Sequence, residues 1–297
     1  MQYLDLSFNH FNKPENIEWL PQLSSLKYLD MSEVNLSNVN NWLHVVNKLS
    51  YLTSLFLYSC NLSNIFSVPL VNSSTSLDVL DLSSNNLTSS FLVLQWLFNF
   101  NTSVVKLVLS HNQFRGLIPD AFSRINSLAH LSLDFIFNLN KCANHSLEGL
   151  YLDQNHLNGT IPVSLGKLSN LESLFLSDNP LEGVIFEAHF SKLSKLKYLV
   201  LSNTLLVFNI NSDWVPPFQL NTIELGSCQL GPRFPKWLQT QKNFYWFDIS
   251  NSGISDTLSN LLKSITIFES ISQPNQWPCS KFVMGVLLFP HNRLEFQ

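Results

Sequence analysis

The sequence predicts a right-handed α/β solenoid, a coil of repeats of about 24 residues with a parallel β-sheet along its concave side. The clearest unit spans residues 147–170, in which Leu150 and Leu152 alternate with outward-facing residues as in a half-buried strand. Asn155 follows where the strand must turn, and its amide can bond the bare backbone groups of neighbouring turns. One such unit cannot bury its leucines alone, so copies must stack on both sides.

These copies occur along most of the chain and share the pattern L-x-x-L-x-L-x-x-N-x-L. Their first apolar positions lie 19 to 27 residues apart, almost wholly within the period of leucine-rich repeats, which identifies the repeat type. The eleven copies begin at Met1, Leu26, Leu52, Leu77, Val104, Leu128, Leu147, Leu171, Leu196, Leu220 and Phe244.

The turn position after each strand is expected to hold a buried residue that links neighbouring repeats. Most repeats place Asn, Thr or Ser there, whereas Val34 leaves a backbone group without a side-chain partner. Cys60 and Cys228 occupy the same position, where this repeat type accepts Asn or Cys. They lie too many repeats apart to form a disulfide with each other, so both are predicted to be buried turn residues. The sequence leaves the pairing of Cys142 and Cys279 open. Residues 41–48 have helical apolar spacing and are expected on the convex side.

The array is expected to consist of two regular parts. Leucine-rich repeats 1–6 fill residues 1–135, an irregular break follows at 136–146, and repeats 7–11 fill 147–257. We expect a local kink at the break, because the next repeat begins only 19 residues after the sixth. Residues 258–297 form a divergent tail with a possible degenerate repeat at 284–294.

Composition and charge favour neither a nucleic-acid partner nor a membrane-spanning segment. Only 13% of residues are charged, the net charge is −4, and no basic run occurs. Met1 leads directly into a repeat, and no run of 18 apolar residues is present. The sequence as given is therefore expected to contain neither an export signal nor an anchor.

The motif L-x-G-x-I-P at 157–162, with a variant at 114–119, resembles the plant-specific class of leucine-rich repeats. Longer segments, such as LKYLDMSEVNLS, FEAHFSKLSKLKYL, NSDWVPPFQL and LGPRFPKWLQTQKNF, are similar to plant receptor-like proteins of the fungal-xylanase (elicitor) receptor group. The resemblance covers residues 1–257. It implies a second short strand after each concave one.

The resemblance also implies a biological setting. Members of this group have an extracellular solenoid, one transmembrane helix and no kinase domain, and they signal through partner receptor kinases. It therefore implies a plasma-membrane protein that binds its ligand on the extracellular side. Because the sequence lacks the family's signal peptide, N-terminal cap, membrane-proximal repeats and transmembrane helix, it resembles a truncated ectodomain fragment.

Seven N-x-S/T sequons predict glycosylation if the protein is exported. Several of them lie just after the turn position, where the chain leaves the core for the surface. The sequon residues are Asn35, Asn61, Asn72, Asn86, Asn101, Asn144 and Asn158.

The sequence contains no recognisable catalytic, metal-binding or cofactor motif, so the protein is not expected to be an enzyme. A carboxylate recurs between the two strand leucines, which could suggest a row of metal ligands. The favoured interpretation is a solvated concave face with the common L-D-L pattern. The residues concerned are Asp5, Asp30, Asp81 and Asp248.

Binding is the remaining function, and the concave face is its predicted location. Aromatic residues at outward strand positions are favoured anchors, although they are also compatible with ordinary variable positions shielded by neighbours. The predicted ligand-contacting residues are Phe56, Tyr58, Tyr151, Phe175, Tyr198, Tyr245 and Trp246.

Three functional hypotheses fit the sequence. The first is the recognition part of a defence receptor for a protein, peptide or glycan elicitor, working with a co-receptor kinase. The second is a soluble inhibitor of a secreted microbial hydrolase. The third is a non-functional truncated gene product.

Overall fold

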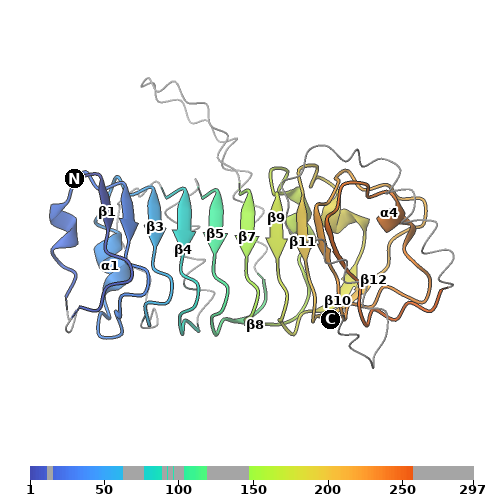
Figure 1. Cartoon of the computed structure of the whole chain (residues 1–297), viewed down its shortest axis with the longest axis horizontal. Helices are drawn as coiled ribbons and strands as arrows, with labels where there is room; N and C mark the ends of the chain where they lie inside the picture. The colour runs from blue at the N-terminus through green and yellow to red at the C-terminus, as the bar shows by residue number, and fades with distance from the viewer. Residues whose placement is uncertain are drawn as a thin grey trace, which may run out of the picture.

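The computed structural model describes residues 1–11, 16–62, 77–88, 92, 96, 104–118 and 147–256. Within these residues a ten-stranded parallel sheet runs the length of a solenoid, with its strands side by side in chain order (Figure 1). The strands of this sheet are β1 (Tyr3–Asp5), β2 (Tyr28–Asp30), β3 (Ser54–Phe56), β4 (Val79–Asp81), β5 (Lys106–Val108), β7 (Gly149–Tyr151), β9 (Ser173–Phe175), β11 (Tyr198–Val200), β13 (Thr222–Glu224) and β14 (Trp246–Asp248). The predicted leucine-rich-repeat solenoid is confirmed.

Each strand is a triplet whose central apolar residue points into the core. The pairing register aligns these central residues from strand to strand, for example Leu4 with Leu29 and Leu29 with Leu55. Leu29 and Leu55 are completely buried. Side chains alternate along a strand, so the two flanking residues of each triplet face the concave side. Ten strands at a spacing of about 4.8 Å make a concave surface roughly 43 Å long.

The order of strands differs from the expected order at one point. β5 pairs directly with β7, in a register that joins Lys106 to Gly149 and Val108 to Tyr151. The repeat beginning at Leu128 was expected to insert its strand between these two, and the direct pairing leaves no place for it there. Leu128 itself, the predicted break at 136–146 and the tail from 258 lie outside the described residues.

Buried asparagines at the turn position join the repeats. Asn85 donates from Nδ2 to the carbonyls of Leu57 and Leu82, at 2.8 and 2.9 Å, and its Oδ1 accepts the backbone N–H of Cys60 at 3.1 Å. One side chain thus satisfies buried backbone groups of two repeats, which apolar surroundings would otherwise leave unpaired. The prediction made for Asn155 is confirmed, and the same arrangement recurs at Asn112, Asn155 and Asn179.

The other turn residues adapt to this role according to their chemistry. Cys60 and Cys228 are buried, as predicted, and both are free thiols. The Cys60 thiol donates to the carbonyl of Met31 at 3.0 Å, so this carbonyl, to which Val34 donates only its backbone N–H, gains a side-chain partner from the next repeat. Burial raises the pKa of the Cys60 thiol to about 12 and that of Cys228 to about 11.

A left-handed corner precedes each turn residue. Ten non-glycine residues, one in each repeat of the sheet, have φ between 50° and 65° at this position. This conformation is uncommon for residues with a Cβ and directs their side chains outward at the flank of the sheet. The ten residues are Phe8, Glu33, Ser59, Ser84, His111, Gln154, Asp178, Asn203, Ser227 and Asn251.

Short second strands follow some of the concave ones, as the resemblance implied. β6 (Arg115–Gly116) pairs with β8 (His156–Leu157), and β10 (Glu182–Ile185) pairs with β12 (Leu205–Phe208), all in parallel. Gly116, Gly159 and Gly183 have positive φ in these segments. The glycine of L-x-G-x-I-P therefore allows a backbone conformation that side chains disfavour.

Short helices form the convex side. They are η1 (Leu20–Gln22), α1 (Trp42–Val46), η2 (Val163–Lys167), η3 (Glu187–Phe190) and α4 (Lys236–Gln239). In α1 the apolar residues are buried and His44 is exposed, as the spacing of residues 41–48 predicted. Among the described residues, none of these helices has the length and apolar character needed to cross a bilayer.

Candidate ligand-binding surface

The concave face presents two rows of side chains, one on each side of the buried central residue of the strands. The first row contains Tyr3, Tyr28, Ser54, Val79, Lys106, Gly149, Ser173, Tyr198, Thr222 and Trp246. The second contains Asp5, Asp30, Phe56, Asp81, Val108, Tyr151, Phe175, Val200, Glu224 and Asp248. Partners within a row lie on adjacent strands, which brings residues about 25 positions apart into contact.

The aspartates of the second row stabilise the ends of their strands. Each carboxylate accepts the backbone N–H of the serine two residues later, at 2.8–2.9 Å, at Ser7, Ser32, Ser83 and Ser250. Bonds from Ser7 also lower the pKa of Asp5 below its ordinary value. Among the described residues, no group of three or more His, Cys, Asp or Glu side chains could hold a metal ion. These carboxylates thus have a structural role in the turn.

Aromatic rings stack across the first three strands. The rings of Tyr3 and Tyr28 lie 4.3 Å apart and nearly parallel, and Tyr28 contacts Phe56 at 5.3 Å. Burial is the largest cause that raises the pKa of Tyr28 to about 12, followed by a hydrogen bond with Tyr3. Phe56 was predicted from the sequence, whereas Tyr3 and Tyr28 were missed. Their position could have been recognised from the sequence, because a tyrosine stands immediately before the central strand leucine in both repeats.

A second cluster lies at the middle of the sheet, on the neighbouring strands β5, β7 and β9 (Figure 1). We call Lys106, Tyr151 and Phe175 the central patch. The rings of Tyr151 and Phe175 are 4.8 Å apart, and the Lys106 ammonium nitrogen lies 5.5 Å from the centre of the Tyr151 ring, within cation–π range. Both predicted aromatic residues are therefore brought together, and Lys106 joins them because β5 pairs with β7.

Gly149 shapes the central patch. A Cβ at this position would lie 2.8 Å from Cε2 of Tyr151, so the ring folds back over the glycine. A side chain there would displace the ring from this position. The sequence contained no signal for this contact, which depends on the rotamer of Tyr151.

The remaining predicted aromatics are arranged differently. Tyr198 is on the strand next to Phe175 but belongs to the first row, where it faces Ser173 and Thr222. A hydrogen bond with Tyr198 is the largest cause that raises the pKa of Tyr245. Tyr245 and Trp246 are 64% and 47% exposed, and Tyr58 is 39% exposed. The other four predicted residues are half-buried, so their role as ligand contacts stays a prediction.

The sequons can be placed in part. Asn35, Asn61, Asn86 and Asn158 are exposed, as a glycosylation acceptor requires. Asn72, Asn101 and Asn144 lie outside the described residues.

Comparison with known proteins agrees with this architecture. The family model described as Leucine Rich Repeat matches residues 103–125, 146–168 and 170–192. Receptor-like protein EIX1 of Solanum lycopersicum is 36% identical over 89% of this chain and 38% of its own length. Receptor-like protein EIX2 of the same species is 37% identical over 96% of this chain and 46% of its own length. The chain belongs to the plant leucine-rich-repeat receptor-like proteins. It spans less than half the length of these two relatives.

Solved structures show the same fold at lower sequence identity. The plant peptide hormone receptor RGFR1, solved in complex with RGF2, superposes with a TM-score of 0.58 at 22% identity, over 84% of this chain and 40% of that one. A TDR receptor superposes with the same score and identity, over 84% of this chain and 43% of its own. This receptor-like chain thus has the solenoid fold of plant receptor ectodomains.

Proposed function

We propose that the chain is the ligand-recognition part of a plant cell-surface receptor-like protein that perceives a secreted microbial protein as a defence elicitor. The central patch of Lys106, Tyr151 and Phe175 on the concave face supports this proposal most directly. The similarity to the two tomato receptor-like proteins supports the receptor setting.

The central patch has the properties of a binding anchor. Aromatic side chains, tyrosine in particular, contribute strongly to protein–protein affinity when they are held in place and dehydrated by the partner. Here they project from three hydrogen-bonded strands, so little backbone conformational entropy is lost on binding. The Lys106 ammonium adds a charge that can pair with a carboxylate of the ligand.

The signalling role is inferred from the family to which the chain belongs. The relatives are named as receptor-like proteins, and the concave carboxylates have structural partners. We propose that the patch lies on the extracellular side of the plasma membrane and that a partner receptor kinase transmits the signal. Bringing this kinase to the ligand-bound solenoid would be the output of recognition.

Binding of a purified secreted fungal xylanase tests the proposal, because the resemblance points to that class of protein elicitor. The protein is secreted from plant cells, and affinity is measured by surface plasmon resonance for the wild type and for Tyr151→Ala, Phe175→Ala and Tyr198→Ala. We expect Tyr151→Ala and Phe175→Ala to weaken binding at least tenfold, and Tyr198→Ala to weaken it less. Tyr51→Ala is the matched control, since Tyr51 is an exposed tyrosine outside the strands of the concave sheet.

Unchanged affinity in both Tyr151→Ala and Phe175→Ala would show that the ligand is not held by the central patch. If Tyr51→Ala weakened xylanase affinity as much as Tyr151→Ala and Phe175→Ala do, the loss would not be specific to the central patch. Absence of binding by the wild type would overturn the assignment to a xylanase.

A further inference from the structure

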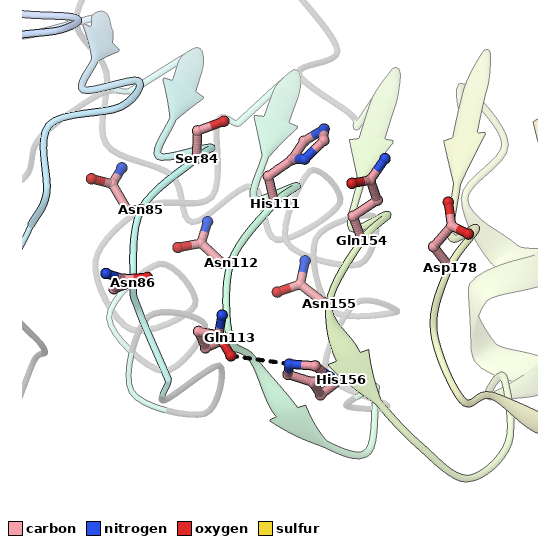
Figure 2. A pocket seen from close by; sticks show the side chains of 10 residues that line it. All are labelled: Ser84, Asn85, Asn86, His111, Asn112, Gln113, Gln154, Asn155, His156 and Asp178. Carbon is pink, nitrogen blue, oxygen red and sulfur yellow. Dashed lines mark hydrogen bonds between the residues drawn. The ribbon is translucent and has the colours of Figure 1, made fainter.

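A polar groove of about 690 Å³ lies at the flank of the sheet, where the chain turns after β4, β5, β7 and β9 (Figure 2). Its floor is formed by the ladder residues Asn85, Asn112 and Asn155. Their amides are committed to backbone groups, so the floor is rigid and contributes little to ligand binding. Any recognition must come from the two walls.

The first wall consists of left-handed corner residues from four repeats: Ser84, His111, Gln154 and Asp178. Their backbone N–H groups donate to carbonyls of the following repeat at 2.9–3.0 Å, which fixes the wall. Within the described residues, the side chains of Ser84, His111 and Gln154 make no hydrogen bond, and one oxygen of Asp178 accepts the amide of Asn203. The wall therefore presents free donors and acceptors on a fixed backbone.

The second wall consists of Asn86, Gln113 and His156, two positions further along each repeat. Gln113 Oε1 and His156 Nε2 are 3.0 Å apart and hydrogen-bonded (Figure 2). The backbone N–H of Gln113 donates to Leu87 at 2.9 Å, and that of His156 donates to Phe114 at 2.8 Å. Both walls are thus preorganised before any ligand arrives.

The chemistry of the lining is that of a site for a neutral polyhydroxylated ligand. The described residues that line it contribute amides, imidazoles, one hydroxyl and one carboxylate, and none of them is Lys, Arg or aliphatic. Among these described residues, an anionic ligand would meet no Lys or Arg, and an apolar peptide would find no aliphatic side chain. Each hydroxyl and acetamido group of a sugar both donates and accepts, which matches amides and imidazoles. The planar His111 and His156 rings also offer faces on which a sugar ring can lie.

We propose that this groove binds β-1,4-linked N-acetylglucosamine. Successive repeats are about 4.8 Å apart, comparable with the length of one such sugar unit, so a linear oligosaccharide along the groove would meet one repeat per sugar. Two sources share this chemistry. The core of an N-linked glycan on exposed Asn86, in the second wall, begins with two such units, and a free chitin fragment consists of nothing else. The first source rests on the proposed extracellular location, whereas the second does not.

Chitotetraose is the probe, and its binding is measured by isothermal titration calorimetry on the full chain secreted from plant cells. Thr88→Ala removes the sequon and leaves Asn86 unmodified. We expect this variant to bind chitotetraose with a Kd near or below about 1 mM. Adding His111→Gly or Gln154→Gly should weaken binding at least tenfold, and glycine suits the positive φ at these positions, so folding is preserved. Asn251→Gly in the Thr88→Ala background is the matched control at the same corner position outside the groove.

The glycosylated wild type identifies the source. Weaker binding by the wild type than by Thr88→Ala would show that the Asn86 glycan fills the groove, and equal binding would assign the groove to the free saccharide. Either result supports the site. The proposal is overturned if folded Thr88→Ala does not bind chitotetraose, or if His111→Gly and Gln154→Gly have no more effect than Asn251→Gly. These outcomes are independent of xylanase binding to the concave face.

Discussion

The Nδ2 of Asn155 donates a hydrogen bond of 3.0 Å to the carbonyl of Leu109, although the two residues are 46 positions apart. The equivalent bond from Asn179 to Leu152 also measures 3.0 Å and spans only 27 positions. The repeat beginning at Val104 and the one beginning at Leu147 are therefore joined in the same way as other neighbours. The concave sheet continues through this point without an intervening strand.

This continuity predicts that part of the segment between β5 and β7 can be removed. Val104 and Leu147 are 43 residues apart, whereas other neighbouring repeats in the sheet are 24 to 27 apart. Deleting residues 124–142 restores a spacing of 24. We expect the shortened protein to keep its fold, with a change in the free energy of unfolding below about 1 kcal/mol, because the entropy of joining two paired strands depends only weakly on the number of residues between them. Circular dichroism and urea unfolding measure this, and loss of cooperative unfolding would contradict the direct pairing of β5 and β7.

Asn155→Ala should be strongly destabilising. It removes three donated bonds to the carbonyls of Leu109, Leu152 and Asp153, and one accepted from the N–H of Phe114, at a site that is almost fully buried. We expect a loss of about 3 kcal/mol in the free energy of unfolding. Asn9→Ala is the matched control, since Asn9 holds the same turn position but is exposed and bonds only within its own turn. Equal effects in urea unfolding would show that the buried ladder does not stabilise the array.

The buried thiols predict a loss of stability at alkaline pH. The ordinary thiol pKa of 9.0 is raised to about 12 at Cys60 and to about 11 at Cys228, mainly by burial. Above pH 9 the unfolded chain releases these protons while the folded chain keeps them, so unfolding becomes easier as pH rises. Each thiol contributes about 1.4 kcal/mol per pH unit, up to pH 12 for Cys60 and pH 11 for Cys228. Urea unfolding between pH 8 and 10 measures the decline. Cys60→Ala should reduce its slope, and an unchanged slope would argue against a thiol that is protonated in the fold.

Gly149→Ala should alter ligand binding with little effect on folding. The new Cβ would push the Tyr151 ring from its position beside Lys106 and Phe175, and a flexible side chain can move. We expect xylanase affinity to fall several-fold and the melting temperature to change little. Gly166→Ala provides the contrast, because its Cβ would collide with the backbone carbonyl of Ala188, which cannot move freely. It should therefore lower the melting temperature. A stable Gly149→Ala variant with full affinity would exclude the central patch from the interface.

The repeat fold could be predicted because its determinants are local in the sequence. Alternating leucines specify the strands, Asn155 marks the turn, and the L-x-G-x-I-P motif begins with Leu157 in β8, two residues before its glycine. The order of the sheet could not be predicted in the same way. Leu128 fits the apolar pattern, but a pattern of alternation does not say which strand a segment pairs with.

The candidate binding surface was predictable only as a set of residue types. Tyr151 and Phe175 were identified as outward aromatics, but their association with Lys106 depends on the register between β5 and β7. The stack of Tyr3 on Tyr28 likewise depends on the register between two strands 25 residues apart. The polar groove was missed because its walls come from left-handed corners, whose side-chain directions are set by φ and not by the alternation of a strand.

Amide hydrogen exchange upon addition of fungal xylanase tests the central claim most directly, because it locates the bound ligand without any substitution. Recognition by the concave face predicts slower exchange in peptides that contain β5, β7 and β9, with no change in the convex helices α1 and α4. Protection confined to those convex helices, or no protection at xylanase concentrations that saturate binding, would contradict recognition by the concave face.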